Sequence, residues 1–376
     1  MSKPDRAVVL GSGGGALTIA AELGLAGVHV TLADLPRFAA GLEPVEAAGG
    51  VMMTFRDEPE LGTRLAPVAE TSSDPASAVK GAPLIIVSVP SFGHRPFADL
   101  LAPVLEDDQM LLWVGEGGGA FAAVAALQAI DRRPAVKLGE TNSLPYGGAS
   151  VDGPGSANAM RKTGGTYLAG MPTATTDAVV TVARGIWPWV EPAANAWETV
   201  LLNFNAIDHV ATMVTNLGRL QGSTGTMMLW GEGASPAVAN VIGSVDGEYT
   251  SMRRALGLST ELRYEDFLVG QGIVDRKRET IHATIHASLL VEAQFECGPD
   301  ALEHRFIAED VPYSLVLASA LASELDVAVP VIDGLIAIAS AAAQRDYRSQ
   351  GRSLADWGLE GVGRDGLLQA VADGWW

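Results

Sequence analysis

Short apolar runs alternate with helical patterns along the first half of the chain. The runs predict strands at six places: Arg6–Gly11, Val28–Asp34, Pro83–Pro90, Met110–Glu116, Ala135–Glu140 and Gly165–Met171. Segments with the apolar spacing of helices lie between or after them, at residues 16–27, 74–82, 120–131 and 175–189. Strands that alternate with helices predict an α/β domain, in which helices cover both faces of a doubly wound, mainly parallel sheet.

The pattern changes after about residue 190. Strand signals fade, and long segments with apolar residues at helical spacing follow: Thr199–Gln221, Ser235–Leu256, Tyr313–Leu325 and Val331–Ala343. This pattern predicts an all-helical C-terminal domain. The connection Glu191–Trp197 carries proline, alanine and asparagine and marks the expected boundary. We therefore expect two domains, residues 1–192 and residues 193–376.

A glycine-rich turn, GSGGGA, joins the first predicted strand to the first predicted helix. Gly11, Gly13 and Ala16 fit the pattern Gly-x-Gly-x-x-Ala in the strand–turn–helix context that this pattern requires. Glycine at the turn lets a pyrophosphate approach the backbone, and the start of the helix offers N–H groups to it. The sequence thus predicts a Rossmann-type dinucleotide site, with cofactor contacts at Gly11, Ser12, Gly13, Gly14, Gly15 and Ala16.

A carboxylate ends the second predicted strand. Asp34 follows the glycine turn by about 20 residues, where an acidic residue accepts hydrogen bonds from the adenosine ribose hydroxyls. Asp34 would repel the 2′-phosphate of NADP, so it favours NAD as the cofactor. Arg37, three residues further on, keeps NADP open as the alternative.

Two further loops follow predicted strands, at the ends where ligands gather in parallel sheets. Pro90, in the loop Val89–His94, is a predicted cofactor contact. His94 could touch the cofactor too, but the pattern favours a histidine in a surface loop. The glycine run within Gly115–Phe121 fits either a ligand loop or a plain turn.

Polar side chains interrupt the apolar helical segment Leu201–Asn216. Asn203, Asn205, Asp208 and His209 are unfavourable inside a buried helix, and they need hydrogen-bond partners there. Histidine suits acid–base catalysis because both of its protonation states are accessible near neutral pH. His209 is therefore a candidate proton handler, and a hydrogen-bonded core histidine is the structural alternative.

A second polar cluster lies in the segment Glu303–Val316. Asp310 could orient an imidazole by accepting its Nδ1–H, and Arg305 could clamp a substrate carboxylate. Both residues also have structural interpretations. Asp310 precedes Pro312 and an apolar run, so it could cap a helix, and Arg305 could be a solvated charge.

Composition narrows the class of protein. The net charge of −19 disfavours nucleic acid and anionic membranes as partners. No uninterrupted apolar stretch of about 18 residues predicts a membrane span, and the N-terminal segment lacks the apolar core of a signal peptide. The single cysteine, Cys297, excludes an internal disulfide and a cysteine-rich zinc site. His282 and His286 share a helix face without an evident third ligand, so no metal is expected, and a cytoplasmic protein is favoured.

Several segments, in the same order along the chain, resemble the octopine/nopaline-type opine dehydrogenases. They are LGSGGGALTIAAELGLAGVHVTLAD, ETNSLPYGGA, NFNAIDHVATMVTNLGRLQ, GEGASPAVANVIGSVDGE, EDVPYSLV and DYRSQGRSLADWGLEG. The resemblance implies that His209 is the catalytic acid–base, that Asp310 is its carboxylate partner, and that Arg305 holds the keto-acid carboxylate. Thr141 and Asn205, within two of these motifs, are the predicted substrate contacts.

The resemblance also implies the reaction, an NAD(P)-dependent condensation of an amino acid's amine with an α-keto acid, followed by reduction of the imine. This chain departs from the family pattern at two places. It has Gly147-Gly148 where many members have a Cys-Arg pair, and it has Asp208 and Val210 where many members have prolines. These departures bear on the substrate more than on the type of reaction.

Two other classes of protein stay open. A β-hydroxyacid or ketopantoate-type dehydrogenase has a similar plan, but those enzymes use a catalytic lysine on the helical domain. Lys277, in DRKRE, is the only lysine after residue 162 and is expected to be solvated. The other alternative is a non-catalytic dinucleotide-sensing protein. The sequence leaves open which amino acid and keto acid are used, and whether the chain forms a homodimer.

Overall fold

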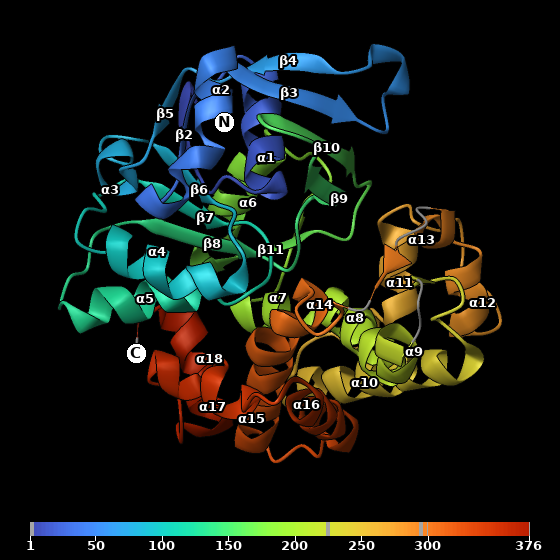
Figure 1. The fold of residues 1–376 in the computed structure, drawn as a ribbon. Coiled ribbons are helices and arrows are strands. Elements are labelled where there is room, and N and C mark those ends of the chain that lie inside the picture. Colours follow the sequence, from blue (N-terminus) through green and yellow to red (C-terminus); the bar gives the residue numbers. More distant parts are fainter. Residues whose placement is uncertain (1–3, 223–225, 293–295, 299, 376) are drawn as a thin grey trace. The chain divides into compact units, whose positions relative to one another are not determined.

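The computed structural model describes residues 4–222, 226–292, 296–298 and 300–375 (Figure 1). The chain folds into two compact units. The N-terminal unit comprises residues 1–199 and 370–376, and the C-terminal unit comprises residues 200–369. The division falls within helix α7 (Ala196–Leu201). The boundary expected between residues 192 and 193, as a division between domains that fold separately, stays a prediction.

An eight-stranded sheet forms the centre of the N-terminal unit, in the order β12-β11-β8-β7-β6-β1-β2-β5. Neighbouring strands are parallel except β8 and β11, which are antiparallel. The strands are β1 (Arg6–Leu10), β2 (His29–Ala33), β5 (Glu70–Ser72), β6 (Leu84–Val87), β7 (Met110–Trp113), β8 (Lys137–Thr141), β11 (Tyr167–Met171) and β12 (Glu191–Pro192). The predicted strands and the mainly parallel, doubly wound sheet are confirmed. Strand order reverses between β1 and β6, and ligands of such folds bind where the order reverses.

A second sheet of four strands was not predicted. Its order is β4 (Arg64–Pro67), β3 (Gly50–Phe55), β10 (Ser156–Arg161) and β9 (Tyr146–Val151). Helix α1 (Gly14–Leu25) contacts strands of both sheets, which is why its residues are buried on nearly all sides (Figure 1). At Gly24 an added Cβ would lie 2.0 Å from the carbonyl oxygen of Pro67, so only glycine permits this close approach.

The remaining helices of the N-terminal unit are short. They are α2 (Glu43–Ala48), α3 (Pro75–Ala78), α4 (His94–Leu101), α5 (Gly119–Ala129) and α6 (Thr176–Arg184), with 3-10 turns η1 (Pro36–Gly41), η2 (Pro59–Leu61), η3 (Ser91–Gly93) and η4 (Thr173–Thr175). In α5 almost every side chain is small or apolar and buried, because the helix packs against both α4 and the sheet.

The C-terminal unit is mainly helical. Its helices are α8 (Phe204–Thr215), α9 (Leu217–Gly222), α10 (Pro236–Ala255), α11 (Tyr264–Gly270), α12 (Ile281–His286), α13 (Leu289–Glu292), α14 (Arg305–Ala308), α15 (Val316–Glu324), α16 (Pro330–Ala343) and α17 (Tyr347–Gln350), with a π turn η5 (Val311–Leu315) and a 3-10 turn η6 (Leu354–Trp357). Helix α18 (Gly363–Asp373) begins in this unit, and its residues from Ala370 onward belong to the N-terminal unit. One small departure from an all-helical unit is the antiparallel pair β13 (Met227–Met228) and β14 (Glu296–Cys297).

The predicted segment Thr199–Gln221 is not one helix. It is broken between α7 and α8 at Asn203, and again at Asn216, whose side chain donates to the carbonyl of Thr212 at 2.8 Å. Asparagine favours such ends because its side chain competes for backbone partners. By contrast, α10 begins as the pattern predicts, since Ser235 accepts a hydrogen bond from the N–H of Val238.

The helical stretch Arg305–Glu324 is long and apolar enough to cross a membrane, but 67% of its most apolar window is buried inside the protein. A buried core helix passes the same test of length and hydropathy. The burial of this stretch therefore fits a packed helix within the C-terminal unit.

Candidate active site

The turn after β1 packs closely on the end of β6. Gly11 has a φ of +116°, and a Cβ there would lie 2.5 Å from the carbonyl oxygen of Ser88, so glycine is required. Gly13 is the N-cap residue of α1. No described atom outside its own neighbours lies within 4 Å of the position that a Cβ would take there. The first N–H groups of a helix have no intrahelical partner. A glycine turn, a helix start and open space beside them fit the pyrophosphate of a dinucleotide.

The next residues of the turn face protein atoms. A Cβ at Gly14 would lie 2.6 Å from the backbone of Ser150, and one at Gly15 would lie 2.8 Å from the hydroxyl of Ser88. Ala16 is fully buried. These three positions explain how α1 fits between its neighbours, and their predicted contacts with the cofactor stay predictions.

Asp34 is fixed beside the glycine turn. It follows β2, is 4% exposed, and accepts hydrogen bonds from the hydroxyl of Ser12 at 2.6 Å and the N–H of Leu35 at 2.7 Å. A carboxylate has about four acceptor positions, so Asp34 can still accept further donors such as ribose hydroxyls. Arg37 is exposed, and its guanidinium lies 4.9 Å from the centre of the Phe38 ring.

The loop after β6 differs from the expectation at one residue. Pro90 is exposed, as a cofactor contact requires. His94, however, is 5% exposed and begins α4, with its ring edge against Trp113 at 5.3 Å between ring centres. The prediction of a surface-loop histidine is therefore wrong. Helical spacing places His94 on the same inner face as Phe97 and Leu101, which are also buried.

The glycine loop after β7 holds a carboxylate of the protein itself. The N–H groups of Gly118 and Ala120 donate to the Glu140 side chain at 2.9 and 3.0 Å. Thr199 donates its hydroxyl to the other oxygen of that carboxylate at 2.6 Å. Glu140 lies on β8, and its fully buried carboxylate contacts the first N–H groups of α5. This carboxylate therefore fills the position that an anionic ligand would take. This loop is structural.

The two predicted substrate contacts have different surroundings. Thr141 is fully buried and accepts a hydrogen bond from the N–H of Gly115 at 3.0 Å. Asn205 is partly exposed in the first turn of α8. Its neighbour Asn203 is 3% exposed and donates to the hydroxyl of Ser314 at 3.1 Å. The contacts of Thr141 and Asn205 with substrate stay predictions.

His209 lies on α8 and is 6% exposed. Its Nδ1 is 2.8 Å from Oδ2 of Asp310, and its ring stacks on Phe306 with 3.5 Å between ring centres. Burial, followed by the positive charges of Arg305 and His304, holds the pKa of His209 well below its usual value. The neutral ring therefore donates its Nδ1–H to Asp310, and its Nε2 lone pair is the basic position.

Asp310 is aimed by an unusual turn. It lies between α14 and the π turn η5, and its side chain makes no capping hydrogen bond. The interpretation of Asp310 as a helix cap is therefore wrong. π turns within helices are rare, and many of them occur at functional sites. Here the carboxylate points to His209 across 101 positions of sequence.

Arg305 begins α14 and is exposed. Among the residues that the structure describes, no carboxylate lies within 4 Å of its guanidinium, although it is close enough to lower the pKa of His209. An exposed guanidinium beside the histidine is available to a substrate carboxylate. This placement agrees with the clamp that the sequence suggested, and the role itself stays a prediction.

Comparison with known proteins gives a consistent family. The α-helical domain of NAD/NADP octopine/nopaline dehydrogenases matches residues 192–343. The opine dehydrogenase of Arthrobacter sp. (strain 1C) is 28% identical over 364 residues, which are 96% of this chain and 98% of that protein. Both comparisons find the chain similar to the octopine/nopaline-type opine dehydrogenases.

Solved structures of octopine and yersinopine dehydrogenases share the fold of this chain. Octopine dehydrogenase in complex with NADH and agmatine has a TM-score of 0.80 at 17% identity, with 98% of each chain covered. Yersinopine dehydrogenase with NADP+ bound has a TM-score of 0.73 at 17% identity, with 100% of this chain and 99% of that chain covered. The fold of these two structures therefore covers 98–100% of this chain.

Asp208 stands where the opine dehydrogenases that this chain resembles often have a proline beside the histidine. It is 5% exposed, and its Oδ2 accepts hydrogen bonds from Tyr264 at 2.8 Å and from the indole of Trp230 at 3.1 Å. Its Oδ1 lies 3.9 Å from Nε2 of His209. Burial raises the pKa of Asp208 to about 7. The sequence signal was present, since an aspartate within an apolar helical segment needs a reason, but its partners could not be predicted.

The Asp208→Asn variant is expected to gain stability over the wild type as pH rises from about 5 to 8. The pKa of Asp208 is 3.8 in an ordinary environment and about 7 in the fold. Between these two pH values the unfolded chain has lost the proton of Asp208 and the folded chain still holds it, so the free energy of unfolding of the wild type falls as pH rises. Asparagine does not ionise, and the difference between the variants should grow by about 2–3 kcal/mol. Urea unfolding at both pH values measures it, and a difference independent of pH would contradict the assignment.

Two lysines bear on the alternative that needs a catalytic lysine. Lys277 is 46% exposed and pairs with Asp266, so it is solvated as expected. Lys162, in the N-terminal unit, is 7% exposed and donates to the hydroxyl of Ser143 at 3.1 Å. Burial lowers the pKa of Lys162 to about 7. Within residues 200–369, as far as they are described, Lys277 is the lysine present, and its ion pair argues against a catalytic role.

The remaining candidates have packed or ordinary surroundings. His282 and His286 lie 4.3 Å apart between ring centres, and His286 Nε2 is 3.3 Å from the carbonyl of Ala234. No group of three or more His, Cys, Asp or Glu side chains suited to a metal occurs among the described residues. Cys297 is buried, and burial raises the pKa of its thiol to about 11, so the reactive thiolate is scarce at neutral pH.

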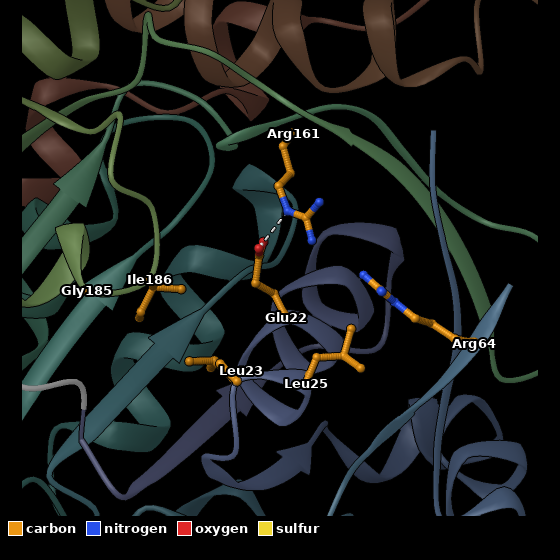
Figure 2. Close-up of a pocket in the computed structure, with 8 residues that line it drawn as sticks. Glu22, Leu23, Leu25, Arg64, Arg161, Gly185 and Ile186 are labelled. Atoms are coloured by element: carbon orange, nitrogen blue, oxygen red, sulfur yellow. Dashed lines mark hydrogen bonds and ion pairs between the residues drawn. The ribbon is translucent and has the colours of Figure 1, made fainter. Parts of the chain in front are cut away.

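A cavity of about 240 Å³ lies at the far end of α1 from the glycine turn (Figure 2). Its charged residues are already paired, since Arg161 binds Glu22 at 2.7 Å and Arg64 binds Glu58 at 2.7 Å. Arg161 also binds Asp57 at 3.1 Å. A ligand there would have to compete with these ion pairs, and we assign the cavity no part in the chemistry.

Proposed function

We propose that the protein is an NAD(P)-dependent opine dehydrogenase that joins the amine of an amino acid to an α-keto acid and reduces the resulting imine, and that it also catalyses the reverse oxidation. The observation that carries the proposal is the hydrogen bond of 2.8 Å between His209 and Asp310 in a chain of this family. The bond fixes the tautomer of a buried neutral imidazole whose Nε2 can move a proton.

His209 is proposed to act in the condensation. Its Nε2 takes one proton from the substrate ammonium, which frees the nitrogen lone pair to attack the keto carbon. The same proton returns from Nε2 to the hydroxyl of the carbinolamine, which leaves as water and gives the protonated C=N bond. Asp310 accepts Nδ1–H throughout and stabilises the imidazolium that forms between these two steps. NADH or NADPH, when bound, supplies the hydride that reduces the C=N bond.

Arg305 is proposed to hold the carboxylate of the keto acid. Its guanidinium is exposed and has no carboxylate partner within 4 Å among the described residues. A planar guanidinium can bind a carboxylate through two parallel hydrogen bonds, which orients the keto carbon as well as binding it. A solved structure of an octopine dehydrogenase is named as a complex with NADH and pyruvate. We propose that a small α-keto acid of this kind is the substrate that Arg305 binds.

The cofactor is proposed to be NAD, with NADP as the second possibility, bound at Gly11, Gly13 and Asp34. The Asp34→Asn variant should raise the ratio of kcat/KM for NADPH over NADH by about 10-fold or more, because a like-charge repulsion of the 2′-phosphate is removed. Asparagine can still accept the hydrogen bond from Ser12. The matched control is Glu70→Gln, an exposed carboxylate on the neighbouring strand β5. An equal ratio in both variants would remove Asp34 from cofactor selection.

One experiment tests the reaction class and the alternatives together. The absorbance of NADH and NADPH is followed with pyruvate or glyoxylate against the twenty protein amino acids. The proposal predicts oxidation of the cofactor only when both an amine and a keto acid are present. Oxidation by a keto acid alone would favour a hydroxyacid-type dehydrogenase, and dinucleotide binding without any turnover would favour a sensing protein.

The setting of the protein is part of the proposal. The fold resembles that of other opine dehydrogenases, and we propose a cytoplasmic location. A homodimer is the oligomeric state to test first, by light scattering on the purified chain. Neither property enters the chemistry proposed for His209 and Asp310.

A further inference from the structure

The imidazole of His209 lies between two carboxylates. Asp310 is bonded to Nδ1 at 2.8 Å, and Oδ1 of Asp208 lies 3.9 Å from Nε2. The first carboxylate orients the ring, but the second is too far from Nε2 for a direct hydrogen bond. A single donor atom about 2.9 Å from each could bridge Nε2 and Oδ1, because the two acceptors are only 3.9 Å apart.

The carboxylate of Asp208 is held firmly at one end. Both side-chain donors that reach it, Tyr264 and Trp230, bind Oδ2. Their hydrogen bonds fix the rotamer and leave Oδ1 on the side of His209. No lysine or arginine nitrogen lies within 4 Å of Asp208 among the residues that the structure describes. A buried carboxylate without a cationic partner is costly, and a cationic ligand would offset that cost.

The electrostatic balance around the ring also favours a cation. Two carboxylates flank a histidine that is neutral, and the one nearby guanidinium that affects its pKa, Arg305, is exposed. Aromatic rings form much of the remaining surroundings, with Phe306 stacked on the imidazole and Trp230 at 6.0 Å between ring centres. Such apolar surroundings strengthen the attraction between the two carboxylates and a cationic ligand.

We propose that Asp208 binds the amino nitrogen of the amine substrate, and that its Oδ1 and Nε2 of His209 hold that nitrogen together. The inference rests on the proposed function. The ammonium donates one N–H to Oδ1 of Asp208 and a second N–H to Nε2 of His209. Before the nitrogen attacks the keto carbon, the ammonium loses the proton of this second N–H to Nε2. The substrate class is a primary amine, recognised by its charge, and Asp208 is therefore a specificity-determining residue.

The test compares Asp208→Asn with the wild type. Asparagine can still accept the hydrogen bonds of Tyr264 and Trp230, so the change removes the charge with little change of shape. The matched control is Tyr264→Phe, which removes one hydrogen bond to the same carboxylate and keeps the charge. Titration calorimetry measures amine binding in the presence of dinucleotide, and steady-state kinetics measures KM for amine and keto acid separately. The probe is the amino acid of the twenty that gives the highest turnover with pyruvate, or binds most tightly if none turns over.

Asp208→Asn should weaken amine binding and raise the KM for amine by about 10- to 100-fold, with dinucleotide affinity and the KM for keto acid unchanged. Tyr264→Phe should have a clearly smaller effect on the amine. The des-amino analogue is a carboxylic acid with hydrogen in place of the amino group. The wild type should bind this analogue at least about 10-fold more weakly than the amine. Wild type and Asp208→Asn should bind the analogue with the same affinity. Losses of equal size for the amine and the keto acid would assign Asp208 to the support of His209 and overturn the proposal.

Failure of this inference differs from failure of the proposed function. Wild-type turnover with an unchanged KM for amine in Asp208→Asn would overturn the role of Asp208 alone. Equal binding of the amine and its des-amino analogue by the wild type would overturn it without any variant. Absence of turnover with every amine and keto acid would overturn the proposed reaction, while charge-dependent binding of an amine would still support the site.

Discussion

Replacement of His209 by asparagine is expected to lower the rate of reductive condensation by about 100- to 10,000-fold, which is the usual contribution of a positioned acid–base group. Asparagine can place an amide N–H where Nδ1–H is bonded to Asp310, so the carboxylate keeps a donor and is not left buried and unpaired. What is lost is the basic Nε2. The rate is measured under saturating amine, keto acid and NADH.

The control for this prediction is His282→Asn, at a partly exposed histidine on α12 outside the His209–Asp310 pair. That variant should retain the wild-type rate. Fluorescence titration with NADH should give the same affinity for all three proteins, since the dinucleotide site is built from residues of the N-terminal unit. Wild-type turnover in His209→Asn would leave the proposed chemistry without its base.

Replacement of Asp310 by asparagine is expected to have the second largest effect, again about 100- to 10,000-fold in kcat. An asparagine at this position can donate to Nδ1 instead of accepting from it. The proton of the neutral imidazole then moves to Nε2, and the basic lone pair points away from the substrate. Loss of the negative charge also removes the stabilisation of the imidazolium.

The double variant His209→Asn, Asp310→Asn sharpens this prediction. If the two residues act as one unit, the double variant should be no slower than the slower single variant, because groups that act together are strongly non-additive. Multiplied losses would show that Asp310 acts independently of His209. A surface carboxylate, Asp333→Asn, serves as the control for the loss of a negative charge; it pairs with Arg348 on an exposed face.

Much of the N-terminal unit could be predicted from local pattern. Apolar β-branched runs gave the strands of the main sheet, and the glycine spacing gave the turn after β1, because both depend on neighbours within a few residues. The four-stranded sheet was missed for the opposite reason. Its strands β3 and β10 pair across about 100 positions of sequence, and a pairing of that range leaves little trace in the local pattern.

The candidate site shows the same limit. The sequence pattern identified the segment around His209 as a candidate site, since polar residues in an apolar helix require hydrogen-bond partners. The sequence could not decide between a helix cap and an imidazole partner for Asp310, and it placed His94 on the surface, although α4 turns that ring inward. Both outcomes depend on the face that a neighbouring element presents, which is a property of packing.

The sequence by itself determined the class of fold, the glycine turn with Asp34, and the resemblance that makes His209, Asp310 and Arg305 candidates. These features can be recognised from residue types and from their spacing over short stretches of sequence. Only the tertiary structure decided that Asp310 faces Nδ1 of His209 and that Asp208 lies beside Nε2 with one oxygen held by Tyr264 and Trp230. The reason is physical: hydrogen bonds and burial act over a few ångströms, and folding brings within that distance residues that are 22 to 101 positions apart.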